Sequence, residues 1–564
     1  VDRILEPQTI AHFLTFLCVG VLPSGRRTSL PLPSEAEVRD NLCSQPYSVW
    51  APHPFSADAE VPVRHVWDHI GSFADAGRLH CVAKELHAMK SRLWEGIVPV
   101  SERRWRERGL DDPRNFGAAC QLLSAVVNVF HYLNHERVRR DLRETYNRIW
   151  ERLGTFETAL NLTRAREGRG PVSVTALWAE FMRDHYKVMV ERAYSWVVDR
   201  VERLQGPILD ALGSHQPATP PISGPQGVAD LRDHFDEVQR ELTDKLDDLT
   251  DIRTHADFAI FVPLDGYKGC PEAAAEESNE DDELQATGLR PLTFTPDPEK
   301  RRERYSARVK VLFRENIMAT VLMGDFLRFA TTGTIAGGLR ALHNGPARMR
   351  ISAEEHVRAQ EKAGREMRGM GPGWDGAEAW VRGLRGIEDW GFVCYRVAER
   401  GGGAWGEFRK RFEGDVAVWG EELGGVEAIR GLPMFHWVDA REHGLGGDAE
   451  GLRKHFATFV KSADFPARFH ASIFLVADEH TVQSYMDPLP ESMPPGDNGG
   501  SILAVDADFD PSADDNEWPG YDGTLRVLGS LLWDELSVFL LRGTYRLQEM
   551  WPLAMKHPWG VYTG

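Results

Sequence analysis

The sequence predicts a mainly α-helical protein that ends in an α+β domain, and two patterns support this fold class. Before residue 256, apolar residues recur at intervals of three and four over long stretches, which is the period of an amphipathic helix. Long helices with narrow apolar stripes and short breaks between them predict an antiparallel helical bundle. After residue 387, short apolar runs alternate with helical stretches, which predicts an α+β domain with a largely antiparallel sheet.

Length and composition limit the classes of protein to consider. A chain of 564 residues is too long for one ordinary core, so we expect roughly two to four domains. The apolar content of 42% excludes global disorder. The net charge of -19 argues against a general nucleic-acid binder, because a polyanion is bound by clustered positive charge. The six cysteines are widely spaced and form no C-x-x-C pair, so we expect mostly free, partly buried thiols in a cytoplasmic protein.

Residues 1–62 predict an irregular N-terminal segment with one short apolar helix. The apolar run IAHFLTFLCVGVL at 10–22 is too short to cross a bilayer. Asp2 and Glu6 precede it, where a signal peptide carries positive charge. We therefore expect a buried helix here, followed by Pro- and Ser-rich irregular chain, and no membrane span.

Residues 63–255 predict the helical bundle. In the stretch 136–160, apolar side chains at steps of three and four define one face, with Arg and Glu between them. The members of this stripe are Val138, Leu142, Tyr146, Ile149, Leu153, Phe156 and Leu160. The same spacing recurs over 177–204 and 228–249, so we expect three long helices that pack through these faces.

Residues 256–386 predict a connecting region. The segment FAIFVPL at 258–264 has the composition of a strand. The segment 271–283 contains seven acids and no base, which predicts a solvated acidic loop. A long helix is expected near 298–330.

Residues 387–564 predict the α+β domain. Helices are expected over 404–423 and 531–551. The expected strands are WGFVCYRVA at 390–398, FHASIFLVAD at 469–478, GSILAVDADF at 500–509 and TLRVLG at 524–529.

Three segments of this domain carry a resemblance to other proteins. IEDWGFVCYR at 387–396 precedes a Trp-containing helical stretch, and ASIFLVADEHTVQSY is followed later by SILAVDADFDP. This combination resembles a family of uncharacterised proteins of filamentous ascomycetes that carry a D-W-G-F-V-x-Y-R segment. The resemblance covers roughly the last third of the chain. It implies a fungal intracellular protein, and it transfers no activity and no functional residue.

The acidic stretch AVDADFDPSADDNEWPGYDG at 504–523 is a candidate calcium site. Pro511 occupies place 6 of an EF-hand loop, where the sharp turn needs glycine, so a true EF-hand is not expected. A solvated acidic turn is the favoured interpretation, and an irregular calcium site is the alternative. The residues at ligand places 1, 3, 5, 9 and 12 are Asp506, Asp508, Asp510, Asp514 and Glu517.

Histidines supply the second candidate metal site. His65 and His69 are four residues apart and share a face if the stretch is helical. The pattern H-x-x-D-H is similar to the inverted zinc motif H-x-x-E-H, but Asp68 is one methylene shorter than the glutamate base of that motif. The candidate is a zinc or iron site, and partly exposed helix histidines are the favoured interpretation.

The sequence favours a non-catalytic interaction or self-assembling protein, with a protein partner or a second copy as its ligand. The striped helices and the seventeen tryptophans support this hypothesis. The alternative is a metal- or small-molecule-dependent enzyme with a site between the helical and α+β parts. Neither a phosphate-binding loop motif nor a G-x-S-x-G motif occurs, but catalytic groups also assemble from distant positions.

Overall fold

The chain forms two compact units in the computed structural model. The first comprises Val1–Pro99 and Gly117–Asp375, and the second comprises Val100–Phe116 and Gly376–Gly564. The predicted acidic loop at 271–283 and the predicted helix near 298–330 lie outside the described residues. The structure describes residues 2–71, 76–214, 225–270, 375–387, 390–399, 402–466, 468–487, 493–510 and 518–564.

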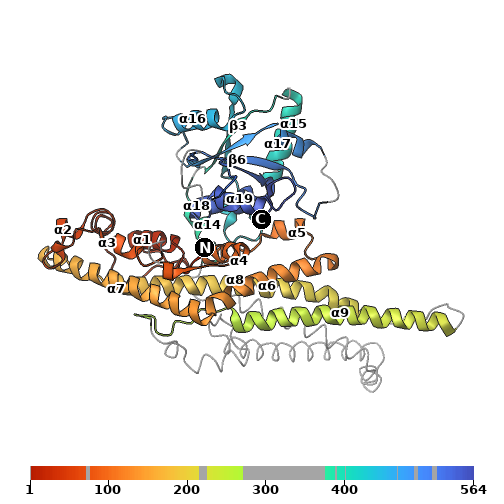
Figure 1. The fold of residues 1–564 in the computed structure, drawn as a ribbon, viewed down its shortest axis with the longest axis horizontal. Helices are drawn as coiled ribbons and strands as arrows, with labels where there is room; N and C mark the ends of the chain where they lie inside the picture. Colours follow the sequence, from red (N-terminus) through yellow and green to blue (C-terminus); the bar gives the residue numbers. More distant parts are fainter. Residues whose placement is uncertain are drawn as a thin grey trace, which may run out of the picture. The chain divides into compact units, whose positions relative to one another are not determined.

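Long helices make up most of the first unit (Figure 1). They are α1 (Gln8–Val19), α4 (Lys84–Trp94), α6 (Phe116–Asn134), α7 (Glu136–Arg166), α8 (Val174–Ser214) and α9 (Pro225–Ala259). The short helices are α2 (Tyr47–Trp50) and α3 (Pro62–Trp67). The two-residue strands β1 (Asp2–Arg3) and β2 (Leu79–His80) pair antiparallel.

The apolar stripe predicted for 136–160 is the buried face of α7. All of its members, from Val138 to Leu160, are buried. Helix α8 packs against both α7 and α9, and its fully buried Trp178 stacks on Tyr146 of α7 with ring centroids 5.6 Å apart. The apolar run at 10–22 forms α1 as predicted, and Phe13 is among its buried side chains. The helical periodicity is confirmed in these elements because the buried faces repeat locally.

The strand predicted at 258–264 does not form. Helix α9 continues to Ala259, and irregular chain follows it. Asn134 at the end of α6 donates hydrogen bonds to the carbonyl oxygens of Ala259 and Phe261, at 2.9 and 3.0 Å. The backbone of this segment is therefore satisfied at a helix end and not in a sheet.

A six-stranded sheet lies at the centre of the second unit, with the order β4-β3-β5-β6-β7-β8. Pairs β3–β4, β3–β5 and β7–β8 are parallel, and pairs β5–β6 and β6–β7 are antiparallel. The sheet is therefore mixed and not largely antiparallel. The four predicted strands are confirmed, and β4 and β8 are additional. The strands are β3 (Trp390–Arg396), β4 (Pro433–Asp439), β5 (Ile473–Ala477), β6 (Ser501–Asp506), β7 (Thr524–Leu528) and β8 (Val561–Tyr562).

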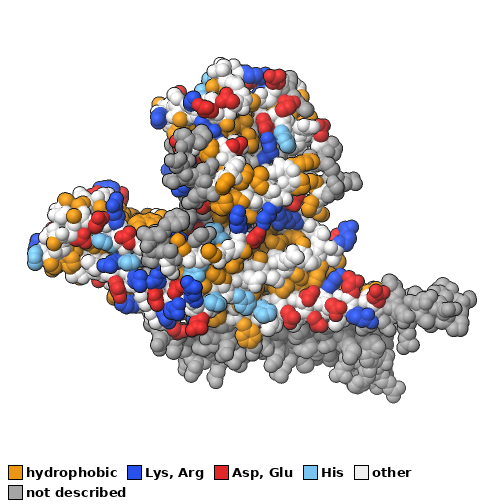
Figure 2. All heavy atoms as spheres, in the orientation of Figure 1, with side chains coloured by type: hydrophobic (Ala, Val, Ile, Leu, Met, Phe, Trp, Pro, Cys, Tyr) orange, Lys and Arg blue, Asp and Glu red, His pale blue; other side chains and the backbone are white. Residues whose placement is uncertain are grey.

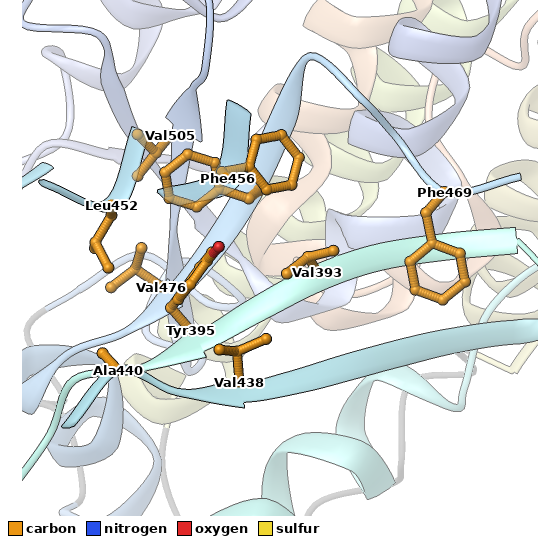
Figure 3. Close-up of a cluster of buried hydrophobic side chains, with 10 residues drawn as sticks. Val393, Tyr395, Val438, Ala440, Leu452, Phe456, Phe469, Val476 and Val505 are labelled. Atoms are coloured by element: carbon orange, nitrogen blue, oxygen red, sulfur yellow. The ribbon is translucent and has the colours of Figure 1, made fainter. Parts of the chain in front are cut away.

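Helices cover both faces of this sheet (Figure 1). Helices α15 (Gly402–Val416) and α17 (Glu479–Met486) lie on one side, and α16 (Ala449–Val460) lies on the other. Figure 3 shows the core on the α16 side, where strand residues pack against the helix. Its members include Val393, Tyr395, Val438, Val476, Leu452 and Phe456. Alternation of side chains across each strand sends every second residue into this core.

Helix α5 (Glu102–Glu107) belongs to the second unit, although the sequence-based division placed it within 63–255. Arg103 donates a hydrogen bond to the carbonyl oxygen of Asp415 at 2.7 Å. Arg104 donates one to the carbonyl oxygen of Gly496, also at 2.7 Å. These charge-assisted bonds join residues that are more than 300 positions apart, so no local pattern reveals them.

The helix predicted over 531–551 is interrupted. One π-helical turn spans Leu532–Leu536, α18 spans Ser537–Arg542 and α19 spans Leu547–Ala554. Gly543 ends α18 with a φ of 64°, a left-handed conformation that glycine adopts without steric cost.

One described helical segment, Pro113–Asn134, is long and apolar enough to cross a membrane by length and composition. Of its most apolar window, 44% is buried, and a core helix passes the same test, so this is weak evidence for a span. Over the face shown in Figure 2, Lys and Arg side chains are interspersed with Asp and Glu side chains. The six cysteines are free, as the sequence predicted.

Candidate functional site

The carboxyl ends of three parallel strands meet at one edge of the sheet in the second unit. Strand β3 ends at Arg396, β4 ends at Asp439 and β5 ends at Ala477. The chain runs from β3 through α15 to β4, and then through α16 to β5 on the other side of β3. In open α/β sheets, ligands bind outside the carboxyl ends of the strands at such a reversal of strand order. This carboxyl edge is therefore the candidate site.

Arg396 and Asp439 form an ion pair at the carboxyl edge. Nη1 of Arg396 donates to Oδ2 of Asp439 at 3.3 Å, and its guanidinium lies 4.5 Å from the ring centroid of Trp405. Nη2 of Arg441 donates to the same carboxylate oxygen at 2.7 Å. The hydrogen bonds from Arg441, with Arg396 close by, lower the pKa of Asp439, so this group is ionised at neutral pH.

Asp478 and Arg526 form a second pair beside the end of β5. Arg526 donates to Oδ2 of Asp478 and, at 3.1 Å, to Oγ1 of Thr481. Oδ1 of Asp478 accepts the backbone N–H of Thr481 at 2.7 Å and so caps α17. Burial alone would raise the pKa of Asp478, but Arg526 and the Thr481 N–H outweigh it and hold the pKa below its ordinary value. The two ion pairs brace the loops that leave β3, β4 and β5.

Two histidines and a buried tyrosine lie at the same edge on the α16 side. The hydroxyl oxygen of Tyr395, red in Figure 3, is 2.8 Å from Nδ1 of His455 in α16. The rings of His455 and His443 have centroids 4.8 Å apart and planes tilted by 55°. Burial, together with the neighbouring His443, lowers the pKa of His455, so this imidazole is neutral at neutral pH.

Among the described residues, strand β4 pairs with β3 alone and so forms an open edge of the sheet. Half of the backbone N–H and C=O groups of an edge strand face away from its neighbour. Met434 is 50% exposed, and His436 on the same face is exposed too. On the other face, Phe435 and Trp437 are half-buried beneath Phe412 of α15, with ring centroids 5.1 and 6.0 Å away. By contrast, β8 at the opposite edge has two residues, both buried.

The acidic stretch predicted as a candidate calcium site is described only in part. Asp506 ends β6, and its Oδ1 accepts the backbone N–H of Asp508 at 3.0 Å. Burial raises the pKa of Asp506. These contacts are those of an acidic turn, and the calcium site stays a prediction. The described stretch ends at Asp510, and the predicted ligands Asp514 and Glu517 lie outside the described residues.

The predicted histidine pair has two separate partners. Helix α3 ends at Trp67, so the helical register that would align His65 with His69 stops before His69. Nε2 of His65 lies 3.0 Å from Oδ2 of Asp58. Nε2 of His69 accepts a hydrogen bond from Nε of Arg152 at 3.1 Å, and burial with this arginine lowers the pKa of His69. These contacts give the predicted zinc or iron site no support.

A buried charged cluster in the first unit was not foreseen from the sequence. Asp2, Glu6 and His87 each offer a ligand atom, and the three atoms lie within 4.8 Å of one another. Lys90 supplies the positive charge there: its Nζ donates to Asp2 at 2.9 Å, to Glu6 at 2.7 Å and to the carbonyl oxygen of Arg3 at 2.7 Å. The ammonium group thus uses its three donors and takes the place of a metal ion. No sequence signal marks Lys90, because helix lysines are usually exposed.

A histidine and a buried serine lie within hydrogen-bond distance in the second unit. Nε2 of His470 lies 3.1 Å from Oγ of Ser537, a distance found between a nucleophile and its base. Ser537 is fully buried, however, and the His470 ring stacks on Phe392 at 4.4 Å. Burial lowers the pKa of His470 to about 4, so the ring is neutral. The pair therefore links the segment before β5 to α18, and the histidine ring packs on β3.

Comparison with known proteins assigns no family to the chain. No protein-family model matches it, no curated protein matches it and no solved structure matches it.

Proposed function

We propose that the protein is an interaction protein that self-associates by pairing strand β4 with β4 of a second copy. The observation that supports this proposal is the open β4 edge. Its seven residues are enough for strand addition, in which backbone hydrogen bonds give affinity and alternate side chains give specificity. Between its first and last residues, β4 carries no Lys, Arg, Asp or Glu, which are the side chains that commonly protect an edge from association.

The β4 strand is complementary to itself in an antiparallel, two-fold arrangement centred on His436. Such an arrangement places Phe435 opposite Trp437 of the second copy, and the reverse pair follows by symmetry. Aromatic cross-strand pairs of this kind contribute roughly 0.2–1 kcal/mol each. Asp439 would lie opposite Pro433, so no two acids face each other, and it keeps its bond to Arg396.

A lysine on the open edge tests the proposal. Met434→Lys introduces a charge on the exposed face of β4, and the matched control Met555→Lys alters a methionine of the same unit that is 47% exposed. In native mass spectrometry of the full chain, we expect dimers for the wild type and for Met555→Lys, and monomers for Met434→Lys. A monomeric wild type, or a dimer that Met434→Lys leaves intact, would overturn the proposal.

A metal- or small-molecule-dependent enzyme is the second candidate function, and the carboxyl edge favours it. The Arg396–Asp439 and Asp478–Arg526 pairs hold charged groups where α/β domains bind ligands. Protein purified from its source without chelator should then carry a stoichiometric extra mass in the same spectra. A bare polypeptide mass would count against this candidate.

A further inference from the structure

We propose that His443 and His455 together bind one divalent transition-metal ion at the carboxyl edge, with Tyr395 as a positioning residue. The two imidazoles come from different elements, since His443 lies in the short helix that follows β4 and His455 lies in α16. This inference does not depend on self-association through β4.

The spacing of the two rings fits a shared metal ion. A zinc ion lies about 2.0–2.1 Å from its imidazole nitrogen and hence about 3.2 Å from the ring centroid. Two such rings have centroids about 5.2 Å apart at a tetrahedral angle and about 4.5 Å apart at a right angle. The observed separation of His443 and His455 is 4.8 Å, which lies between these values. The tilt of 55° between the ring planes excludes parallel stacking.

Tyr395 fixes the orientation of one of the two ligands. Its hydroxyl group lies 2.8 Å from Nδ1 of His455, so Nε2 is the nitrogen left for a metal ion. Metal-binding histidines generally use their second nitrogen in a hydrogen bond that sets the ring orientation and the tautomer. The phenol itself cannot swing away, because Tyr395 is fully buried and its ring packs edge-on against Phe474 at 5.2 Å.

The chemistry of the donors determines the class of metal. Two imidazoles suit zinc, copper or nickel, whereas calcium and magnesium prefer oxygen ligands. His443 is exposed and His455 is half-buried, so an ion can reach the pair from solvent and keep water in its other positions. The pair therefore supplies a chelating site with open coordination positions.

Calorimetric titration of the full chain with Zn²⁺ tests the site. We expect one ion per chain, and we expect its binding to be lost in His443→Ala and in His455→Ala. The matched control is His131→Ala, which disrupts another close imidazole pair, His131 and His255, whose centroids are 5.4 Å apart in the first unit. His65→Ala tests the pair that the sequence predicted. Binding that survives both carboxyl-edge variants, or that disappears in either control, would overturn the proposal.

A second measurement distinguishes a role of Tyr395 in positioning the ligand from a role in folding. With Cu²⁺ as the probe, electron paramagnetic resonance of the wild type should show two equatorial nitrogen ligands, and His443→Gln should show fewer. Tyr395→Phe keeps the buried ring and should weaken Zn²⁺ binding by about 10- to 100-fold, as loss of an orienting hydrogen bond does. Its amide hydrogen exchange in β3 and α16 should match the wild type. Unchanged affinity in a folded Tyr395→Phe variant would reject the positioning role.

Discussion

Replacement of Lys90 by methionine should destabilise the first unit strongly. Lys90 is 1% exposed and lies between the buried carboxylates of Asp2 and Glu6, which are 0% and 4% exposed. Methionine preserves most of the side-chain volume but removes the ammonium group and its three hydrogen bonds. Two carboxylates would then remain buried side by side without a cation, which is far more costly than replacing a whole ion pair by apolar groups.

The magnitude follows from two arguments. Removal of one partner of a buried ion pair costs about 3–5 kcal/mol. For Asp2, burial alone would raise the pKa, but Lys90, His87 and Tyr132 lower it from 3.8 to about 2. This difference corresponds to about 2.5 kcal/mol of stability, present above the unfolded pKa and lost as pH falls from about 4 to about 2. The difference in stability between the wild type and Lys90→Met should therefore become smaller as pH falls over that range.

Hydrogen exchange resolved by segment is the suitable assay, because a chain with two units does not unfold in one step. The free energy of opening in α1 and α4 should fall by about 3–5 kcal/mol in Lys90→Met at neutral pH. Lys84→Met, which replaces an exposed lysine of the same helix, should change it by less than about 0.5 kcal/mol. A loss below about 1 kcal/mol in Lys90→Met would refute the idea that its ammonium group holds this cluster together.

Three further substitutions test the second unit. Gly391→Ala should loosen β4 from β3, because a Cβ atom there would lie 1.9 Å from the carbonyl oxygen of Met434. In amide hydrogen exchange, the free energy of opening of these strands should fall by at least about 1–3 kcal/mol. In Gly406→Ala of α15, the added Cβ meets nothing within 4 Å, so the stability of the helix should instead rise by about 0.5–1 kcal/mol. Equal changes in stability in the two glycine variants would contradict this account. Burial raises the pKa of Asp534 from 3.8 to about 7, so its folded form binds a proton that the unfolded form releases, and stability falls as pH rises from about 4 to about 7. Asp534→Asn keeps the acceptor for the Gly420 N–H. The substitution should therefore leave stability unchanged near pH 4 and raise it by up to about 4 kcal/mol near pH 8. A change in melting temperature that does not depend on pH would disprove this.

Local periodicity in the sequence predicted many of the helices and strands. The stripe in α7 and the apolar run in α1 are visible in the sequence because a helix places residues three and four apart on one face. The strands β3, β5, β6 and β7 are visible because short runs of branched and aromatic residues end at turn-forming residues. The segment 258–264 shows the limit of this reasoning, since apolar residues at a helix end have the same composition as a strand.

The pairing of strands in the sheet could not be predicted from the sequence. Burial alternates along strand β4, but its exposed face carries the apolar Met434, so the sequence lacks the apolar–polar alternation that identifies a strand. Its parallel pairing with β3 depends on the path of α15, which a local pattern does not specify. The prediction of a largely antiparallel sheet was wrong for this reason, although the four predicted strands were confirmed.

The sequence by itself determined the long helices of the first unit and the mixed helix and strand content of the last third. Only the tertiary structure brought Lys90 to Asp2, and His443 to His455 and Tyr395. Those groups are separated by 88 positions in the first case and by 60 positions between Tyr395 and His455. A helix or strand repeats its pattern within a few residues, whereas a site is assembled where distant elements meet, and the physical information for that meeting lies in packing.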